Sequence, residues 1–64
     1  MDVFIEKQDR HHRLSFRGSG DRLLALFDIN PETVILVKDG QLITSDTMLK
    51  DTDAVRILSV ISGG

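Results

Sequence analysis

The sequence predicts one small α+β domain, in which a short helix packs across a mixed sheet of four to five strands. Three observations support this prediction. The chain has 64 residues, which suffice for only one hydrophobic core. Short runs in which apolar and polar residues alternate flank a single stretch with helical spacing. Glycine, proline and asparagine residues separate these runs, as turns require.

The first predicted element is a β-hairpin. One strand contains Val3-Phe4-Ile5, and the other runs over residues 12–17. The basic side chains of this hairpin are Lys7, Arg10, His11, His12, Arg13 and Arg17. We interpret this charge as a solvated turn. The alternative is a surface that faces an acidic partner or a tRNA-bound complex.

A short helix follows, predicted from Gly20 to Asp28. Ser19 or Gly20 is suited to its N-cap, and Asp21 lies near the positive end of the helix dipole. Its apolar face is formed by three residues at three- and four-residue spacing, Leu23, Leu24 and Phe27. A helix this short is marginal alone, so packing on the sheet must supply most of its stability.

A second hairpin is predicted after the helix. Residues 30–33 form a capped single turn, with Pro31 at a first helical position where its missing N–H costs nothing. A β-branched, apolar strand then runs from Thr33 to Lys38. Asp39-Gly40 is a strong hairpin signal and leads into the partner strand, residues 41–44.

Residues 45–53 form a polar connection, which Met48 and Leu49 are expected to anchor on the core. The last strand begins near Ala54. The acidic residues of the connection, Asp46, Asp51 and Asp53, have no interval typical of a calcium loop. We expect Asp51 or Asp53 to fix the turn before the last strand.

Composition excludes several classes of protein. Cysteine is absent, so there is no disulfide, thiolate metal site or thiol nucleophile. A net charge of −2 gives no general attraction for nucleic acid or membrane surfaces. No apolar run approaches the roughly 20 residues that cross a bilayer, so a soluble, cytoplasmic monomer is expected. So small a chain has no room for a deep substrate cavity, which argues against a self-sufficient enzyme.

Neither metal binding nor base stacking is expected. The adjacent His11 and His12 point to opposite sides of a strand, and no carboxylate lies at metal-ligand spacing. Only three aromatic residues are present, Phe4, Phe16 and Phe27, and at least two of them occupy core positions.

The sequence closes with Ile61-Ser62-Gly63-Gly64. Two glycines without side chains can enter a narrow channel in any backbone conformation and present an unhindered carboxylate. We therefore expect residues 1–61 to form the domain and residues 62–64 to form a flexible tail, in which Gly64 is the residue that reacts.

The chain resembles the ubiquitin-like sulfur carrier family in the order of its predicted elements and in three segments. These segments are Asn30-Pro31-Glu32-Thr33-Val34, Asp39-Gly40 and Ile61-Ser62-Gly63-Gly64. This family includes ThiS, the molybdopterin synthase subunit MoaD, and carriers for tRNA thiolation such as TtuB. The similarity covers essentially the whole chain and is greatest to the TtuB type. It implies the β-grasp fold.

The resemblance also implies a reaction at the C-terminus. A separate E1-like enzyme would join the Gly64 carboxylate to AMP at the expense of ATP, and a persulfide would displace AMP to leave a thiocarboxylate. Gly63, which has no side chain, would let Gly64 enter a narrow channel of that enzyme, while Ile61 and Ser62 would form the stalk. The chain itself would be a cosubstrate without a bound cofactor, and not a catalyst.

The partners implied are the adenylating enzyme, a sulfur donor of the cysteine desulfurase or rhodanese type, and a synthase that accepts sulfur for tRNA thiolation or thiamine biosynthesis. Two alternatives use the same Gly64. One is a protein modifier that forms an isopeptide bond with lysines of target proteins. The other is a permanent small subunit, as in molybdopterin synthase.

Strand alternation predicts where partners bind. If Ile35, Val37, Val55 and Ile57 point inward, three apolar side chains point to the opposite face of the sheet: Leu36, Leu58 and Val60. In the resemblance, Leu36 and Leu58 match the exposed apolar patch of ubiquitin-like proteins. We expect these three residues to form a partner-binding patch. A slip of one residue would exchange the two sets.

Overall fold

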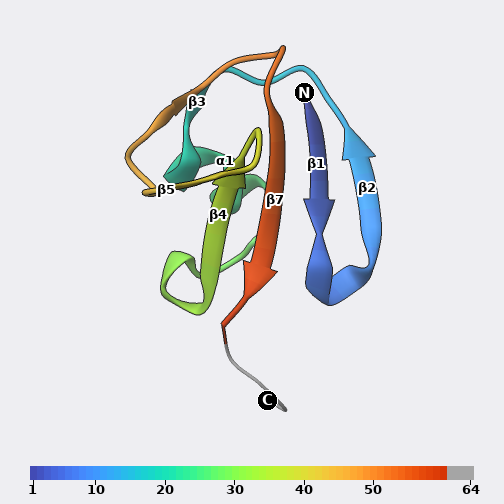
Figure 1. The fold of residues 1–64 in the computed structure, drawn as a ribbon, viewed down its shortest axis with the longest axis vertical. Helices are drawn as coiled ribbons and strands as arrows, with labels where there is room; N and C mark the ends of the chain where they lie inside the picture. The colour runs from blue at the N-terminus through green and yellow to red at the C-terminus, as the bar shows by residue number, and fades with distance from the viewer. Residues whose placement is uncertain (61–64) are drawn as a thin grey trace.

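The structure is a computed structural model that describes residues 1–60, so Ile61, Ser62, Gly63 and Gly64 lie outside the described residues. Its main sheet has five strands in the order β2-β1-β7-β4-β5 (Figure 1). Their bounds are β1 Asp2–Ile5, β2 Arg10–Arg13, β4 Val34–Lys38, β5 Gln41–Ile43 and β7 Ala54–Ser59. The central pair, β1 and β7, is parallel and the other neighbours are antiparallel, so the sheet is mixed as predicted.

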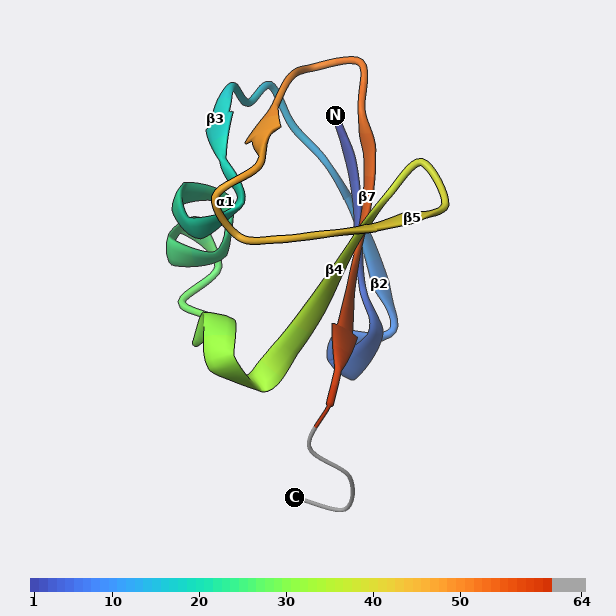
Figure 2. The ribbon, with the colours of Figure 1, turned by 60° about the vertical axis from the view of Figure 1, so that its left-hand side comes forward.

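One α-helix, α1 (Gly20–Leu26), covers one face of this sheet among the described residues. A second, two-stranded sheet lies beside it and pairs β3 (Gly18–Ser19) with β6 (Met48–Leu49). Figure 2 shows α1 and β3 on the same side of the main sheet. This side is called the inner face below, and the opposite side is the outer face.

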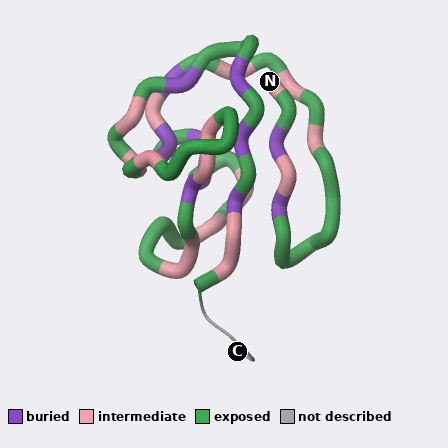
Figure 3. The backbone as a smooth tube through the Cα atoms, viewed as in Figure 1, coloured by how far each residue is buried: buried purple, intermediate pink, exposed green. Residues whose placement is uncertain are grey.

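The core lies between the inner face and α1. Leu23 and Leu24 of the helix are 0% and 1% exposed. The other buried apolar residues are Val3, Ile5, Leu36, Leu49, Val55 and Ile57. Figure 3 shows buried and more exposed positions alternating along β1 and β7. Each fully buried aliphatic side chain stabilises the domain by roughly 1.5–3 kcal/mol, so this single layer supplies most of the stability.

The local turn chemistry confirms several sequence predictions. The Ser19 hydroxyl accepts a hydrogen bond from the Arg22 N–H at 3.4 Å and caps α1. The Asn30 side chain accepts from the Glu32 N–H at 3.0 Å and caps the 3-10 turn Pro31–Thr33. Asp39 and Gly40 both have positive φ, 49° and 85°, as a two-residue hairpin turn with the right twist requires.

The second strand and the helix both end earlier than predicted. The second strand was expected over residues 12–17, but β2 ends at Arg13 because the chain then leaves the hairpin to place Gly18–Ser19 against β6. The helix ends at Leu26 and not at Asp28. Asp28 adopts a positive φ of 56°, and the Ile29 N–H returns to the Leu24 carbonyl at 2.9 Å, which closes the helix.

The connection from residue 45 to residue 53 anchors on the core through Leu49, which is 2% exposed, as predicted. Met48 does not share this role, because it is 66% exposed on the opposite side of the short strand β6. The turn prediction is confirmed for Asp53, whose carboxylate accepts the Lys50 N–H at 2.9 Å. The Asp51 carboxylate instead accepts the Phe16 N–H and ties the connection to the first hairpin.

Candidate functional site

The predicted face assignment was wrong for the strand that contains Leu36. Leu36 is 3% exposed and pairs with the buried Ile57, so it belongs to the core and not to a partner-binding patch. Ile35, expected inside, is 40% exposed. The reason is that the antiparallel register places Ile35 opposite Leu58, and directly paired residues share a face.

The outer face carries a continuous set of apolar side chains, which we call the apolar surface. Its residues are Ile35, Val37, Leu42, Leu58 and Val60. Leu42 and Val60 are 75% and 46% exposed, whereas Val37 and Leu58 are half-buried. Leu58 and Val60 thus lie on the outer face, as predicted. Ile35 takes the position on this face that was predicted for Leu36. A contiguous exposed apolar set is typical of a protein contact.

The apolar surface reaches the end of the described chain. The Ser59 N–H donates to the Glu6 carboxylate at 3.1 Å, and the Val60 N–H donates to the Thr33 carbonyl at 3.0 Å. The end of β7 is therefore held from both sides, by the turn after β1 and by the Pro31–Thr33 turn that precedes β4. These contacts place Val60 beside Leu58 and Ile35, immediately before the sequence Ile61-Ser62-Gly63-Gly64.

The other half of the outer face, over β1, β2 and the middle of β7, has a different character. The Phe4 and His11 rings lie 4.7 Å apart, and the Arg56 guanidinium lies 5.3 Å from the centre of the Phe4 ring. Asp2 lies beside them, with 3.8 Å between its carboxylate and His11 Nδ1. These side chains border a shallow hollow of about 370 Å³. Sequence reasoning missed this cluster, because its members come from three strands.

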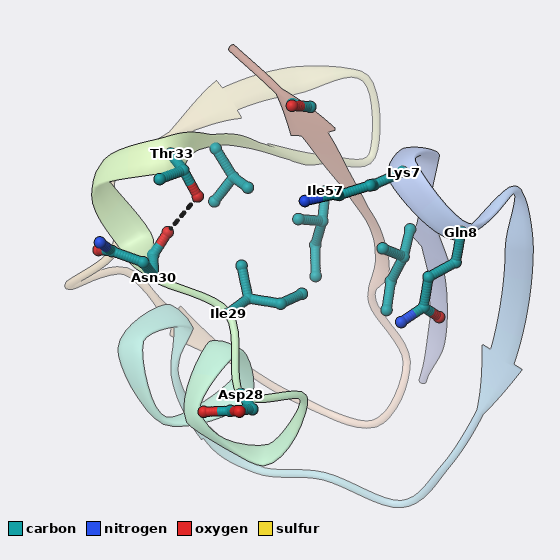
Figure 4. A pocket seen from close by; sticks show the side chains of 10 residues that line it. Lys7, Gln8, Asp28, Ile29, Asn30, Thr33 and Ile57 are labelled. Atoms are coloured by element: carbon teal, nitrogen blue, oxygen red, sulfur yellow. Dashed lines mark hydrogen bonds between the residues drawn. The ribbon is translucent and has the colours of Figure 1, made fainter. Parts of the chain in front are cut away.

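A larger cavity, of about 610 Å³, opens on the inner side near the end of β7. Ile5, Ile29 and Ile57 contribute apolar walls. Figure 4 shows the Lys7 side chain extending across it toward Ile57, with Asp28 on the far rim. The Thr33 hydroxyl donates to the Asn30 carbonyl at 2.8 Å along its border. Lys7 and Asp28 are the ionisable groups of this lining, and they come from opposite rims.

No cluster of three or more His, Cys, Asp or Glu side chains in residues 1–60 has an arrangement that could hold a metal ion. In the same residues, α1 and the shorter turns lack the length and apolar character that a membrane-crossing helix needs.

Comparison with known proteins identifies the family. A model of the ThiS family matches residues 6–64, which is nearly the whole chain. The chain belongs to the ThiS family. The mixed five-stranded sheet with one helix on its inner face agrees with this membership and confirms the predicted β-grasp fold.

A curated relative is more specific but covers less of the chain. The sulfur carrier protein TtuB of Thermus thermophilus is 42% identical to this chain over 36 residues. The aligned segment covers 56% of this chain and 55% of TtuB. The predicted similarity to the TtuB type is therefore supported by a relative that aligns with about half of each chain.

Proposed function

We propose that this protein is a sulfur carrier, which transports sulfur as a thiocarboxylate on Gly64. Membership of the ThiS family supports the proposal, since the family match runs to Gly64. The similarity to the sulfur carrier protein TtuB supports it further. Glycine at positions 63 and 64 suits this role because a residue without a side chain allows close approach of an activating enzyme.

The observation that carries the proposal is the position of the apolar surface at the end of β7. A carrier of this size has no catalytic apparatus of its own and must be held by larger proteins while its C-terminus reacts. Ile35, Leu58 and Val60 offer an apolar contact immediately before the four terminal residues. A partner that docks there receives the C-terminus at a defined point.

The proposed chemistry proceeds in three steps. The Gly64 carboxylate attacks the α-phosphorus of ATP and releases pyrophosphate, which gives an acyl adenylate. The terminal sulfur of a persulfide on a partner cysteine then attacks the carbonyl carbon and AMP leaves. A second thiol attacks the sulfur of that cysteine in the resulting acyl disulfide, which frees the Gly64 thiocarboxylate and leaves a disulfide behind.

The proposal assigns three kinds of partner. An E1-like adenylating enzyme activates Gly64, a persulfide donor of the cysteine desulfurase or rhodanese type supplies sulfur, and a synthase accepts it for tRNA thiolation or thiamine biosynthesis. We assign the docking of the adenylating enzyme to Ile35, Leu58 and Val60. Leu36 has no part in it, because it lies in the core.

An intact-mass experiment tests the proposal. The chain is incubated with an E1-like adenylating enzyme, ATP and a persulfide donor, and a matched variant that lacks Gly64 serves as control. We expect one oxygen to be replaced by sulfur in the full chain only. An unchanged mass with an enzyme that modifies another member of the ThiS family would contradict the proposal.

Two other observations distinguish the alternatives. High-mass adducts in cells that disappear when Gly64 is deleted would indicate a protein modifier. Copurification in a stable complex with a larger subunit would indicate a permanent enzyme subunit.

A further inference from the structure

The edge of the main sheet at β2 is open in the described structure (Figure 1). Met1 and Leu14 exchange two backbone hydrogen bonds, of 2.8 and 3.0 Å. Bonded pairs alternate along an antiparallel ladder, so the next bonded pairs are Val3 with His12 and Ile5 with Arg10. His11 and Arg13 therefore direct their backbone N–H and C=O groups away from the sheet. Within residues 1–60, these groups have no hydrogen-bond partner.

Positive charge is concentrated at this edge. Residues 7–17 contain four of the eight Lys and Arg residues but only one acidic residue, Asp9. This segment has a net charge of +3, that is 4 − 1, and the rest of the chain has −5, that is 4 − 9. On the outer face, Arg13 and His11 of β2 continue toward Arg56 of β7, with Asp2 as the nearest carboxylate. The edge is thus electrostatically opposite to the rest of the molecule.

Two other occupants fit this edge poorly. A second copy of β2 would bring the basic side chains of the two copies close together, and like charges across a strand pair are destabilising. Single-stranded nucleic acid requires an open aromatic face for base stacking. The Phe4 ring offers none, because His11 and Arg56 pack on it at 4.7 and 5.3 Å.

We propose that β2 is a docking edge for an extended, acidic segment of a partner protein, which joins the main sheet as an additional strand. The backbone groups of His11 and Arg13 pair with the segment and supply binding energy. Because alternate residues of the segment lie on one face, its carboxylates meet the Arg13 side chain on the outer face, beside His11, which fixes its register.

This docking edge is separate from the apolar surface and adds a second contact to that used in the proposed sulfur transfer. The sheet places β2 and β5 at opposite ends, so one partner segment can occupy β2 while Ile35 and Leu58 remain exposed. Loss of peptide binding would leave the thiocarboxylate assay unchanged, and the two proposals can therefore fail independently.

The test uses the full chain and three synthetic probes. The first is a capped seven-residue peptide of alternating glutamate and valine, and the second is the same peptide with lysine in place of glutamate. The third is the acidic peptide N-methylated on alternate residues, prepared in two registers: one methylates the amides that would pair with β2, and the other methylates the amides between them. A single-stranded RNA of similar length is a fourth probe. Backbone amide shifts and hydrogen exchange at His11 and Arg13 are measured, with Ile35 and Leu58 as internal references.

We expect the acidic peptide to bind and to protect the His11 and Arg13 amides, and the lysine peptide to leave them unchanged. Arg13→Glu should weaken binding by about tenfold, as loss of a charge-assisted contact would. Arg22→Glu, with the same change of charge on the exposed side of α1, should weaken it far less. N-methylation in the register that blocks pairing should also cost about tenfold, since two backbone hydrogen bonds are lost.

Three results would overturn the proposal. Equal binding of both N-methylated registers would show charge attraction without strand pairing. Tighter binding of RNA at the same amides would assign the edge to nucleic acid. Absence of binding at millimolar peptide would show that the basic residues only prevent this edge from associating with other sheets.

Discussion

Apolar side chains on the two faces of the segment from Val55 to Val60 have opposite roles. Val55 and Ile57 on the inner face are each 1% exposed, because α1 packs over them. Leu58 and Val60 on the outer face have comparable hydrophobicity, but Val60 is 46% exposed and no helix in residues 1–60 covers them. Hydrophobicity alone therefore does not identify the core. In a domain with one helix, the face without the helix is available to a partner.

Substitutions at two adjacent residues of β4 test the difference between the two faces most directly. Leu36→Asp places a charge in the core, where burial without a partner costs several kcal/mol. A domain of this length has a total stability of roughly 3–10 kcal/mol, so we expect the cooperative urea transition to be lost. Ile35→Asp changes a side chain that is 40% exposed and should shift stability by about 1 kcal/mol or less.

Circular dichroism during urea unfolding measures both variants. The reverse order of stability, with Leu36→Asp folded and Ile35→Asp unfolded, would restore the original face assignment.

A second prediction concerns how closely α1 approaches the inner face. A Cβ at Gly20 would lie 2.7 Å from the Leu36 Cδ1 atom and 3.1 Å from the Ser45 carbonyl oxygen. Gly20→Ala should therefore push the helix away from the sheet and cost about 1–3 kcal/mol, as overpacking does. The control is Gly40→Ala, where a Cβ meets nothing within 4 Å and only the positive φ of 85° opposes it.

The free energy of unfolding of both glycine variants is measured by urea titration. We expect Gly40→Ala to lower the free energy of unfolding by about 1 kcal/mol, because a residue with a side chain is strained in the left-handed backbone conformation. A Gly20→Ala variant as stable as the unmodified chain would mean that α1 does not determine which face is buried.

The third prediction tests the outer face by function. Leu58→Asp should leave the fold intact, because Leu58 is half-buried and lies opposite Ile35 outside the core. If the apolar surface docks the adenylating enzyme, a charge there should lower kcat/KM for ATP-dependent activation by about tenfold or more, as at other interface hot spots. Pyrophosphate release reports activation. An unfolded variant would place Leu58 in the core, and an unchanged rate would remove it from the docking surface.

Features of the fold that depend on local chemistry could be predicted from the sequence. Asn30 and Ser19 cap turns through their own side chains, and Asp39-Gly40 supplies the backbone conformations that its hairpin requires. The pairing of β3 with β6 could not be predicted. Gly18 pairs with Leu49, which lies far away in the sequence, and a two-residue strand has no periodicity to read.

The face of β4 could not be predicted for a different reason. Every residue from Val34 to Val37 is apolar, so alternation within the strand does not distinguish the inner from the outer face. The charged Lys38 favours the wrong answer, because it shares the inner face with Leu36. It is tolerated at the end of the sheet, where its amine lies 3.9 Å from the buried carboxylate of Asp53. The correct assignment requires the register with β7.

The smallest effect is expected at the far end of the apolar surface. Leu42 is 75% exposed and lies opposite Val37 on the edge strand β5, whereas Val60 adjoins the four terminal residues. Leu42→Ser should change the free energy of unfolding by less than about 0.5 kcal/mol, because little area is removed from contact. It should also lower the activation rate less than Val60→Ser does, since contacts near the reacting terminus position it most directly. Parallel pyrophosphate-release measurements on the two serine variants decide this. If Leu42→Ser is the more damaging change, the docking contact is centred on the β4–β5 hairpin, and the apolar side chains at the end of β7 only accompany it.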